Sequence, residues 1–288
     1  MKQPTPLRKI TGTAPNTTLP KGSIDSHMHI YARDYPTQAG GPQSPSDFAG
    51  LDKYRQVQAW LGLERLVIVQ ANAHQQDNSC LLNALNHFGD SSRGVACIRP
   101  NTPESTLEEY HRQGVRAARI MELGGATRLH DLLAVNSLVQ PFNWSCIVQF
   151  DGNQINQHSA LLQKIQGNYV LDHHAKFMRP ISVDSSEFST LLKLIDRGNC
   201  YFKLAGCYET SRSGYPDYAD LAKVAKALIA HAPQRIIWGS NWPHVSKPAT
   251  DTPDDGQLLD TVCSWIPSRQ VLRQIFVDNP AKLYDFSQ

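Results

Sequence analysis

The feature that most constrains this fold is a regular alternation of short apolar runs with segments of helical periodicity. Eight runs are rich in β-branched residues, and successive runs start about 20 to 40 residues apart. Runs of this length and composition are typical of buried β-strands. They are "SIDSHMHI" (23–30), "RLVIVQ" (65–70), "GVACIRP" (94–100), "VRAARIM" (115–121), "SCIVQF" (145–150), "NYVLDHH" (168–174), "CYFKLAG" (200–206) and "RIIWGSN" (235–241).

The segments between the runs carry the spacing of amphipathic helices. In "LDKYRQVQAWLG", for example, Tyr54, Val57 and Leu61 fall on one stripe. Several segments stop at glycine just before the next run, as in "WLGLERLVIV" and "DRGNCYFKL", which is typical of a helix C-cap. This alternation predicts parallel strands joined by helical crossovers, and eight units favour a closed (β/α)8 barrel over an open sheet.

The domain organisation follows from the same pattern. No GxGxxG follows the first run and the chain has no GxxxxGK[ST], so the nucleotide-binding forms of an open sheet lose support. There is no internal repeat and no long linker. The sequence therefore predicts a short arm rich in Pro and Thr over residues 1–22, followed by one TIM-barrel domain over residues 23–288.

Composition and charge exclude several classes of function. The formal net charge is +2 and no run of Lys and Arg occurs, so we expect no nucleic-acid partner. No window approaches the roughly 20 apolar residues of a membrane span. The first residues lack the apolar core of a signal peptide, and the six cysteines are scattered, which together predict a cytoplasmic protein with free thiols.

The polar residues that end the apolar runs are the candidates for an active site. Active sites of (β/α)8 barrels lie at the carboxyl ends of the strands. All eight runs end in, or are followed by, histidine, an amide or a cation. These residues are His27 and His29, Gln70 with Asn72, Arg99, Arg119, Gln149, Asp172 with His173, Lys203, and Asn241 with His244.

The stretches around these ends resemble a known family. "IDSHMHIY", "VLDHHAKF", "YFKLAGCYE" and "IIWGSNWPH" are similar to the amidohydrolase superfamily, and more narrowly to its branch of metal-independent lactone enzymes. "ITGTAPN", "ANAHQQDN" and "QFDGN" fit the sugar-diacid lactone isomerases of that branch, to which the pyrone-dicarboxylate lactonases are related. The resemblance covers nearly the whole chain. It implies an amidohydrolase-like barrel, a role in sugar-acid catabolism, and a small acidic sugar lactone as substrate.

The chain departs from the metal-binding pattern of that superfamily. The resemblance implies that metal-dependent members carry two His on the first strand, Lys or Glu on the fourth, His on the fifth and sixth, and Asp on the eighth. His27, His29 and His173 are present here, but Gln149 and Asn241 stand at the fifth-strand and eighth-strand positions. A neutral amide is a poor metal ligand and cannot deprotonate water. We predict an enzyme without metal or other cofactor, and zinc held by the three histidines is the alternative.

The missing carboxylate on the eighth strand favours isomerisation over hydrolysis. In a lactonase that carboxylate would activate water, whereas an isomerase uses a hydroxyl held in the substrate itself. Only proton transfer and oxyanion stabilisation then remain for the protein. His173, whose tautomer Asp172 can fix, is the first candidate for the proton carrier, and His29 is the second. Asn241 is predicted to donate to the oxyanion or to orient the sugar hydroxyls.

Cations at the strand ends favour an acidic substrate. Arg119 and Lys203 are the candidates to bind its carboxylate. The other predicted substrate contacts are His27, Gln70, Asn72, Gln149, Tyr208 and His244. Because side chains alternate along a strand, His174 is expected to point away from His173.

Three other functions remain open at this stage. The first is a lactone hydrolase that acts on a sugar-acid or pyrone dicarboxylate lactone. The second is a metal-dependent amidohydrolase or decarboxylase, and the third is a barrel that has lost catalysis and serves as a binding protein. The sequence is compatible with a homo-oligomer and leaves the lactone ring sizes and the sugar stereochemistry open.

Overall fold

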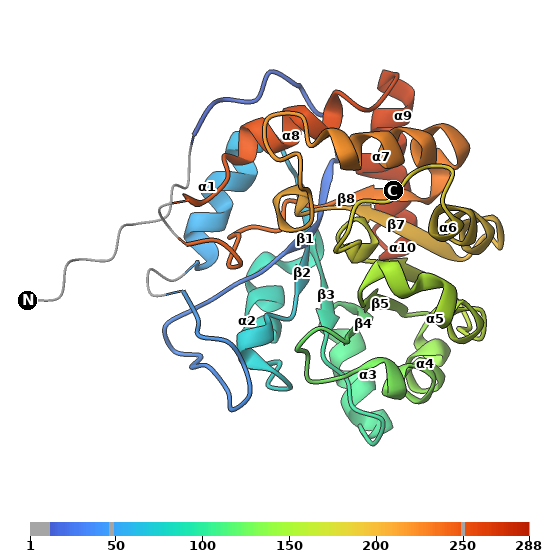
Figure 1. Ribbon diagram of the computed structural model, residues 1–288. Coiled ribbons are helices and arrows are strands. Elements are labelled where there is room, and N and C mark those ends of the chain that lie inside the picture. Colours follow the sequence, from blue (N-terminus) through green and yellow to red (C-terminus); the bar gives the residue numbers. More distant parts are fainter. Residues whose placement is uncertain (1–11, 46–48, 249–250, 288) are drawn as a thin grey trace, which may run out of the picture.

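Eight parallel strands follow one another around a barrel in the order of the sequence, and the helices lie outside them (Figure 1). The computed structural model describes residues 12–45, 49–248 and 251–287. Every predicted run contains a strand, which confirms the predicted (β/α)8 class. The strands are β1 (Ile24–Met28), β2 (Arg65–Val69), β3 (Ser92–Ala96), β4 (Val115–Met121), β5 (Ser145–Gln149), β6 (Tyr169–Leu171), β7 (Cys200–Leu204) and β8 (Ile236–Trp238).

The helices begin and end at residues with the expected capping chemistry. Gly62 closes α1 in the left-handed conformation, with φ 74°, and the Ser185 hydroxyl accepts a hydrogen bond from the backbone N–H of Phe188 at the start of α6. None of the described helices is both long enough and apolar enough to cross a membrane. The α-helices are α1 (Leu51–Leu61), α2 (Ser79–Phe88), α3 (Glu104–Arg112), α4 (Leu132–Val139), α5 (Ile155–Leu162), α6 (Ser186–Asp196), α7 (Ala219–His231), α8 (Asp255–Cys263), α9 (Arg269–Arg273) and α10 (Asn279–Leu283).

The barrel closes where the chain leaving β8 meets β1. The backbone N–H of Asn241 donates to the carbonyl of His27 at 2.8 Å, and the N–H of His29 donates to the carbonyl of Trp242 at 2.8 Å. The buried carboxylate of Asp25 strengthens this seam, because it accepts from the backbone N–H groups of His27 (3.0 Å) and Ser240 (2.9 Å). Closure therefore brings the polar end of β8 beside the first-strand histidines.

Two layers of apolar side chains hold the barrel together. One layer packs between the strands and the surrounding helices. The other fills the inside of the barrel, and it includes Tyr284 and Phe286 from the end of the chain. The segment before β1 lies against α8, since the Asp260 carboxylate accepts hydrogen bonds from the backbone N–H groups of Asn16 and Thr17 at 2.8 Å each.

Candidate active site

The polar end of the barrel is set by the alternation of side chains along the strands. The apolar inner layer includes one residue from each of β4 to β7: Ala117, Ile147, Val170 and Tyr201. Two residues further along, the chain carries buried polar side chains: Arg119, Gln149, Asp172 and Lys203. Because side chains two residues apart share a face of a strand, the polar groups lie directly above the apolar layer, at the carboxyl ends.

A cavity of about 270 Å³ opens at this end of the barrel. Six of the predicted site residues line it: His29, Asn72, Arg119, Gln149, His173 and Asn241. The other six lie beneath or behind its wall: His27, Gln70, Asp172, Lys203, Tyr208 and His244. The structure thus gathers the predicted residues at one end of the barrel and separates those that can touch a ligand from those that support them.

A buried cluster of charges lies beneath the cavity. The Lys203 ammonium is 3.1 Å from Asp172 Oδ1 and 3.1 Å from His27 Nδ1. Burial alone would raise the pKa of Asp172, but His173, His27 and Lys203 together hold it well below its ordinary value. Asp172 is therefore an anion balanced by Lys203. Lys203 is fully buried in this ion pair and does not line the cavity. The prediction that it binds the substrate carboxylate directly is therefore replaced by a role in balancing Asp172.

Hydrogen bonds fix the tautomers of the two histidines on β1. His29 Nδ1 is 2.9 Å from the carbonyl oxygen of Val69, which can only accept, so Nδ1 carries the proton. His29 Nε2 then accepts from the Nε2–H of His27, 3.2 Å away, and His27 Nδ1 accepts from Lys203. Burial lowers the pKa of His29 to about 3. Both nitrogens of His29 are occupied, so it offers no open base to a ligand.

The chain turns sharply after β6. The run predicted as a strand over residues 168–174 stops at Leu171, because His173 to Lys176 all adopt left-handed backbone conformations, with φ between 48° and 56°. Such conformations cost of order 1–3 kcal/mol for a non-glycine residue, and they cluster at functional sites. The turn brings His173 to the cavity and leaves His174 in the core. Only one of the two histidines therefore lines the cavity, but the cause is this turn and not the strand alternation from which the difference was predicted.

His173 combines a carboxylate neighbour with a ring nitrogen that has no hydrogen-bond partner among the described residues. Its Nε2 is 3.7 Å from Asp172 Oδ2, and its Nδ1 has no hydrogen-bond partner within the described part of the chain. Burial lowers the pKa of His173, while Asp172 and Glu209 act in the opposite direction. A β-carbon at Gly206 would lie 3.3 Å from this Nδ1, so glycine keeps the space beside it clear. A neutral imidazole in this state can accept a proton and return it.

A chain of hydrogen bonds determines how Asn241 is oriented. Its Nδ2 donates to Glu209 Oε1 at 3.2 Å and to the Tyr208 hydroxyl at 2.8 Å. A carboxylate only accepts, so the Asn241 atom that faces Glu209 must be the nitrogen. Tyr208 donates to His244 Nδ1 at 2.8 Å, and His244 Nε2 donates to Asp255 Oδ1 at 2.9 Å. Both amide hydrogens of Asn241 are used, which leaves its carbonyl oxygen for a ligand.

This series of hydrogen bonds changes the roles expected of three predicted residues. Asn241 has no N–H left for the predicted donation to an oxyanion, whereas its predicted contact with a sugar hydroxyl requires only the carbonyl oxygen. Tyr208 and His244 lie behind Asn241, and His244 is fully buried with both ring nitrogens bonded. Tyr208 and His244 therefore hold Asn241 in place and do not line the cavity.

Arg119 presents an unbalanced cation to the cavity. Its side chain is buried, and one Nη donates to the carbonyl oxygen of Gln70 at 2.6 Å. Its Nε has no hydrogen-bond partner, and no ion pair to Arg119 occurs among the described residues. Gln70 stabilises the loop that follows β2, because its side-chain nitrogen donates to the backbone oxygens of Gln75 and Asp77. Arg119 is therefore placed to receive a carboxylate.

The donors beneath the cavity do not suit a divalent cation. His27, Asp172 and His173 offer ligand atoms that lie within 4.8 Å of one another. Lys203 already contacts two of these groups, and its positive charge opposes a second cation at short distance. Gln149, from the fifth strand, adds only a neutral amide. This arrangement fits the lysine ammonium.

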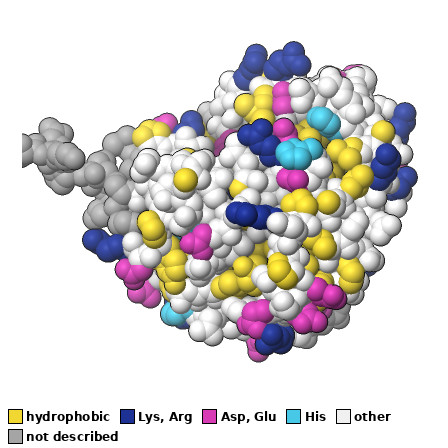
Figure 2. Space-filling model, turned by 90° about the horizontal axis from the view of Figure 1, so that it is seen from below, with side chains coloured by type: hydrophobic (Ala, Val, Ile, Leu, Met, Phe, Trp, Pro, Cys, Tyr) yellow, Lys and Arg dark blue, Asp and Glu magenta, His cyan; other side chains and the backbone are white. Residues whose placement is uncertain are grey.

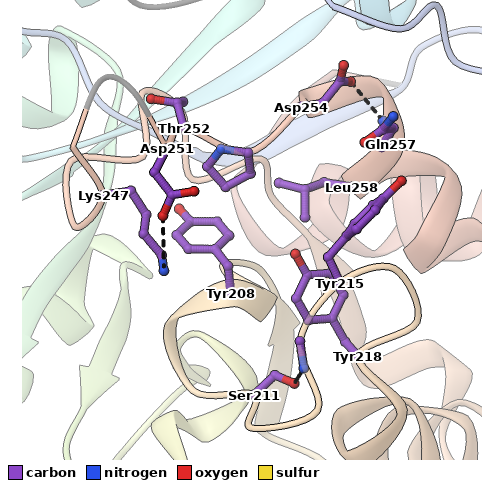
Figure 3. A pocket seen from close by; sticks show the side chains of 12 residues that line it. Tyr208, Ser211, Tyr215, Tyr218, Lys247, Asp251, Thr252, Asp254, Gln257 and Leu258 are labelled. Carbon is purple, nitrogen blue, oxygen red and sulfur yellow. Dashed lines mark hydrogen bonds and ion pairs between the residues drawn. The ribbon is translucent and has the colours of Figure 1, made fainter.

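A second pocket, of about 380 Å³, lies on the outer side of Tyr208. Figure 3 shows the rings of Tyr208, Tyr215 and Tyr218 around it, with the ion pair of Lys247 and Asp251 nearby. Tyr208 is the one predicted site residue in its lining. The imidazole, guanidinium and amide groups that could act on a lactone line the smaller cavity, which is therefore the candidate active site.

The residue that the sequence analysis missed is Glu209. It lies in a short turn after β7 (Cys207–Glu209) and lines the cavity next to Asn241. Its place three residues beyond "KLAG", next to the predicted Tyr208, was the available signal. Over the face shown in Figure 2, the described basic and acidic side chains are interspersed, without a continuous basic surface.

A parallel barrel with buried histidines and an aspartate at the carboxyl ends of its strands is the architecture of an amidohydrolase. The amidohydrolase family profile matches residues 24–286, so the chain belongs to this family. Within it, the chain is 43% identical to D-galactarolactone isomerase from Agrobacterium fabrum, over 98% of this chain and 97% of the relative.

Two further comparisons agree with this assignment. A 2-pyrone-4,6-dicarboxylate hydrolase from Comamonas testosteroni is 26% identical, over 94% of this chain and 92% of the relative. A crystal structure from Agrobacterium tumefaciens superimposes with a TM-score of 0.94 at 43% identity, covering 97% of this chain and 99% of that chain. The resemblance inferred from the strand ends is thereby confirmed.

Proposed function

We propose that this enzyme isomerises D-galactaro-1,5-lactone to the 1,4-lactone by intramolecular acyl transfer, in hexuronate and galactarate catabolism. The observation that carries the proposal is that His173, whose Nδ1 has no hydrogen-bond partner among the described residues, and an amide that follows β8 line the same cavity. A proton carrier is present, while a carboxylate to activate water is missing at that position. The isomerase relative supports the choice of lactone.

The reaction then proceeds without water. The 4-hydroxyl of the 1,5-lactone attacks the C1 carbonyl, the C1–O4 bond forms, and the C1–O5 bond breaks. His173 takes the proton from O4 and returns it to O5, while Asp172 stabilises the imidazolium between the two steps. Because nucleophile and carbonyl belong to one molecule, holding the substrate in the reactive geometry supplies much of the rate enhancement.

The remaining side chains bind and orient the substrate in this proposal. Arg119 receives the free carboxylate on its guanidinium, which has no acidic partner among the described residues. The carbonyl oxygen of Asn241 accepts from a sugar hydroxyl that does not react, and Asn72 and Gln149 contact other sugar hydroxyls. The imidazolium that His173 becomes on taking the proton offsets part of the negative charge that develops on the tetrahedral oxygen.

The test of this function is the substitution Asn241→Asp. A carboxylate at this position can accept a proton from water, so we expect slower isomerisation and the appearance of the open diacid as a second product. The gain in hydrolysis should be small, because the new carboxylate lies beside Glu209 and repels an acidic substrate. Carbon NMR of the 1,5-lactone with purified enzyme separates the 1,4-lactone from the diacid in one spectrum.

The matched control is the wild-type enzyme in the same buffer, with the uncatalysed reaction subtracted. Wild-type enzyme should yield the 1,4-lactone with little diacid. A wild type that produces mostly diacid, faster than the background reaction, would assign the protein to the lactone hydrolases and show that the amide on β8 does not decide the outcome.

We also propose that the reaction requires no metal, because the Lys203 ammonium contacts both His27 and Asp172. Purified protein should contain only a small fraction of an equivalent of zinc or manganese by elemental analysis. Dialysis against a chelator should leave the isomerisation rate unchanged. Stoichiometric metal together with turnover that a chelator abolishes and zinc restores is the result that contradicts this proposal.

We further infer a cytoplasmic location. The six cysteines are free, and five of them are buried. Buried free thiols are typical of proteins that work in a reducing compartment.

A further inference from the structure

The ionised side chains that line the cavity leave one positive charge uncompensated. Lys176 and Glu209 form an ion pair with each other. Arg119 has no acidic partner among the described residues. His29 and His173 stay neutral, since burial lowers the pKa of both imidazoles. The lining therefore matches the charge of a ligand that carries a single carboxylate.

Glu209 is a fixed negative charge in this lining. Its carboxylate is 10% exposed, and it accepts from Lys176 Nζ, from Asn241 Nδ2 and from the Ser246 hydroxyl at 3.0 Å. Burial alone would raise the pKa of Glu209, but His173 and Lys176 lower it to about 2. Glu209 therefore stays ionised across the physiological range.

Arg119 and Glu209 lie on different sides of the cavity. Arg119 belongs to β4, while Glu209 follows β7, and these strands are three positions apart in an eight-stranded barrel. Both side chains line the same cavity of about 270 Å³. A small cyclic acid held at Arg119 by its carboxylate thus directs its far edge toward the wall that contains Glu209.

We propose that Glu209 is a specificity-determining residue that restricts this cavity to lactones with one carboxylate and excludes dicarboxylates. The proposal rests on the proposed function, in that the cavity is the lactone site. A second carboxylate on the ligand would meet the carboxylate of Glu209 at short range, and repulsion of this kind is how a binding site rejects a wrong ligand. Lys176 does not neutralise the second carboxylate of such a ligand, because it is already paired with Glu209.

The experiment is a direct binding measurement with two inert probes, furan-2-carboxylate and furan-2,5-dicarboxylate, by titration calorimetry. Wild type should bind the monocarboxylate more tightly than the dicarboxylate. Glu209→Gln retains an oxygen to accept from Asn241 and Ser246, and it frees Lys176 as a second cation. We expect this variant to shift the preference toward the dicarboxylate by roughly ten- to a hundredfold.

Three variants serve as controls for charge. Lys176→Met leaves Glu209 unbalanced and should weaken both probes. The double variant Glu209→Gln with Lys176→Met removes the repelling carboxylate without freeing a second cation, so its preference should lie between those of wild type and Glu209→Gln. Arg119→Met should lose the monocarboxylate, because it removes the unpaired guanidinium.

The outcome does not depend on turnover, since neither probe is a lactone. If Glu209→Gln keeps the wild-type ratio of affinities, the proposal is wrong. If that variant does not fold, wild type decides alone, because equal affinity for the two probes contradicts the proposal and a preference for the monocarboxylate supports it. A wild type that shows this preference but does not isomerise the lactone would overturn the proposed function and leave the role of Glu209 intact.

Discussion

Replacing His173 by alanine is expected to lower the isomerisation rate by roughly 10²–10⁴-fold, the usual contribution of a positioned acid–base group. His173 lines the cavity, and no other described imidazole there has a nitrogen without a hydrogen-bond partner, because His29 uses both of its own. The loss should appear in kcat, since the substrate carboxylate still binds at Arg119. Single-turnover measurements at saturating lactone test this directly.

The matched control for this variant is His174→Ala. His174 is the adjacent imidazole, but it packs in the core against Phe202 and Trp265 and does not line the cavity. Its loss should reduce the free energy of unfolding and leave kcat within a few-fold of wild type. Equal losses of kcat in both variants would indicate that the turn after β6 is a structural element, without proton transfer by His173.

The pH dependence gives a second test of the same residue. His173 must be neutral to accept a proton, and burial lowers its pKa below the ordinary 6.5. The rate should therefore rise with pH through a pKa below about 6.5 and stay level above it. A rate that continues to rise well above that value would point to a different base.

Replacing Lys203 by methionine is expected to reduce the free energy of unfolding by about 3–5 kcal/mol, because it leaves Asp172 as an uncompensated buried charge. Lys203 and Asp172 are at most 1% exposed, and the ammonium lies 3.1 Å from Asp172 Oδ1. Urea unfolding at neutral pH measures the loss. The matched control is Lys193→Met on the exposed side of α6, which should change stability by no more than about 0.5 kcal/mol.

The difference between this variant and wild type should shrink in acid. In wild type the pKa of Asp172 is held well below 3.8. Its contribution to stability is therefore fully present above pH 3.8 and is lost as the pH falls from 3.8 through the lowered pKa. Without Lys203, burial raises the pKa of Asp172, and protonation then stabilises the folded variant as pH falls. The additional change Asp172→Asn should recover part of the loss, and a double variant as unstable as Lys203→Met would contradict this account.

Most of the fold could be predicted because its signals are local. β-Branched runs, helical stripes and glycine stops such as Gly62 depend on residues that are neighbours in the chain. Strand ends were predicted less well, since β3, β6 and β8 stop three or four residues before the ends of their predicted runs. At β6, four successive left-handed residues from His173 to Lys176 follow the end of the strand. Nothing in "DHHAKF" announces that turn, since non-glycine residues adopt this conformation only where surrounding structure compensates for its cost.

The sequence by itself determined that the polar residues would gather at one end, because parallel strands of a barrel place all their carboxyl ends together. Only the tertiary structure decided which atoms remain open. Lys203 meets His27 from 176 positions away, and Asn241 is oriented by Glu209 from 32 positions away. Hydrogen bonds and ion pairs of this kind form only when the barrel closes, because closure brings together residues that are far apart in the sequence. The local sequence around each residue does not indicate which distant residue it will contact.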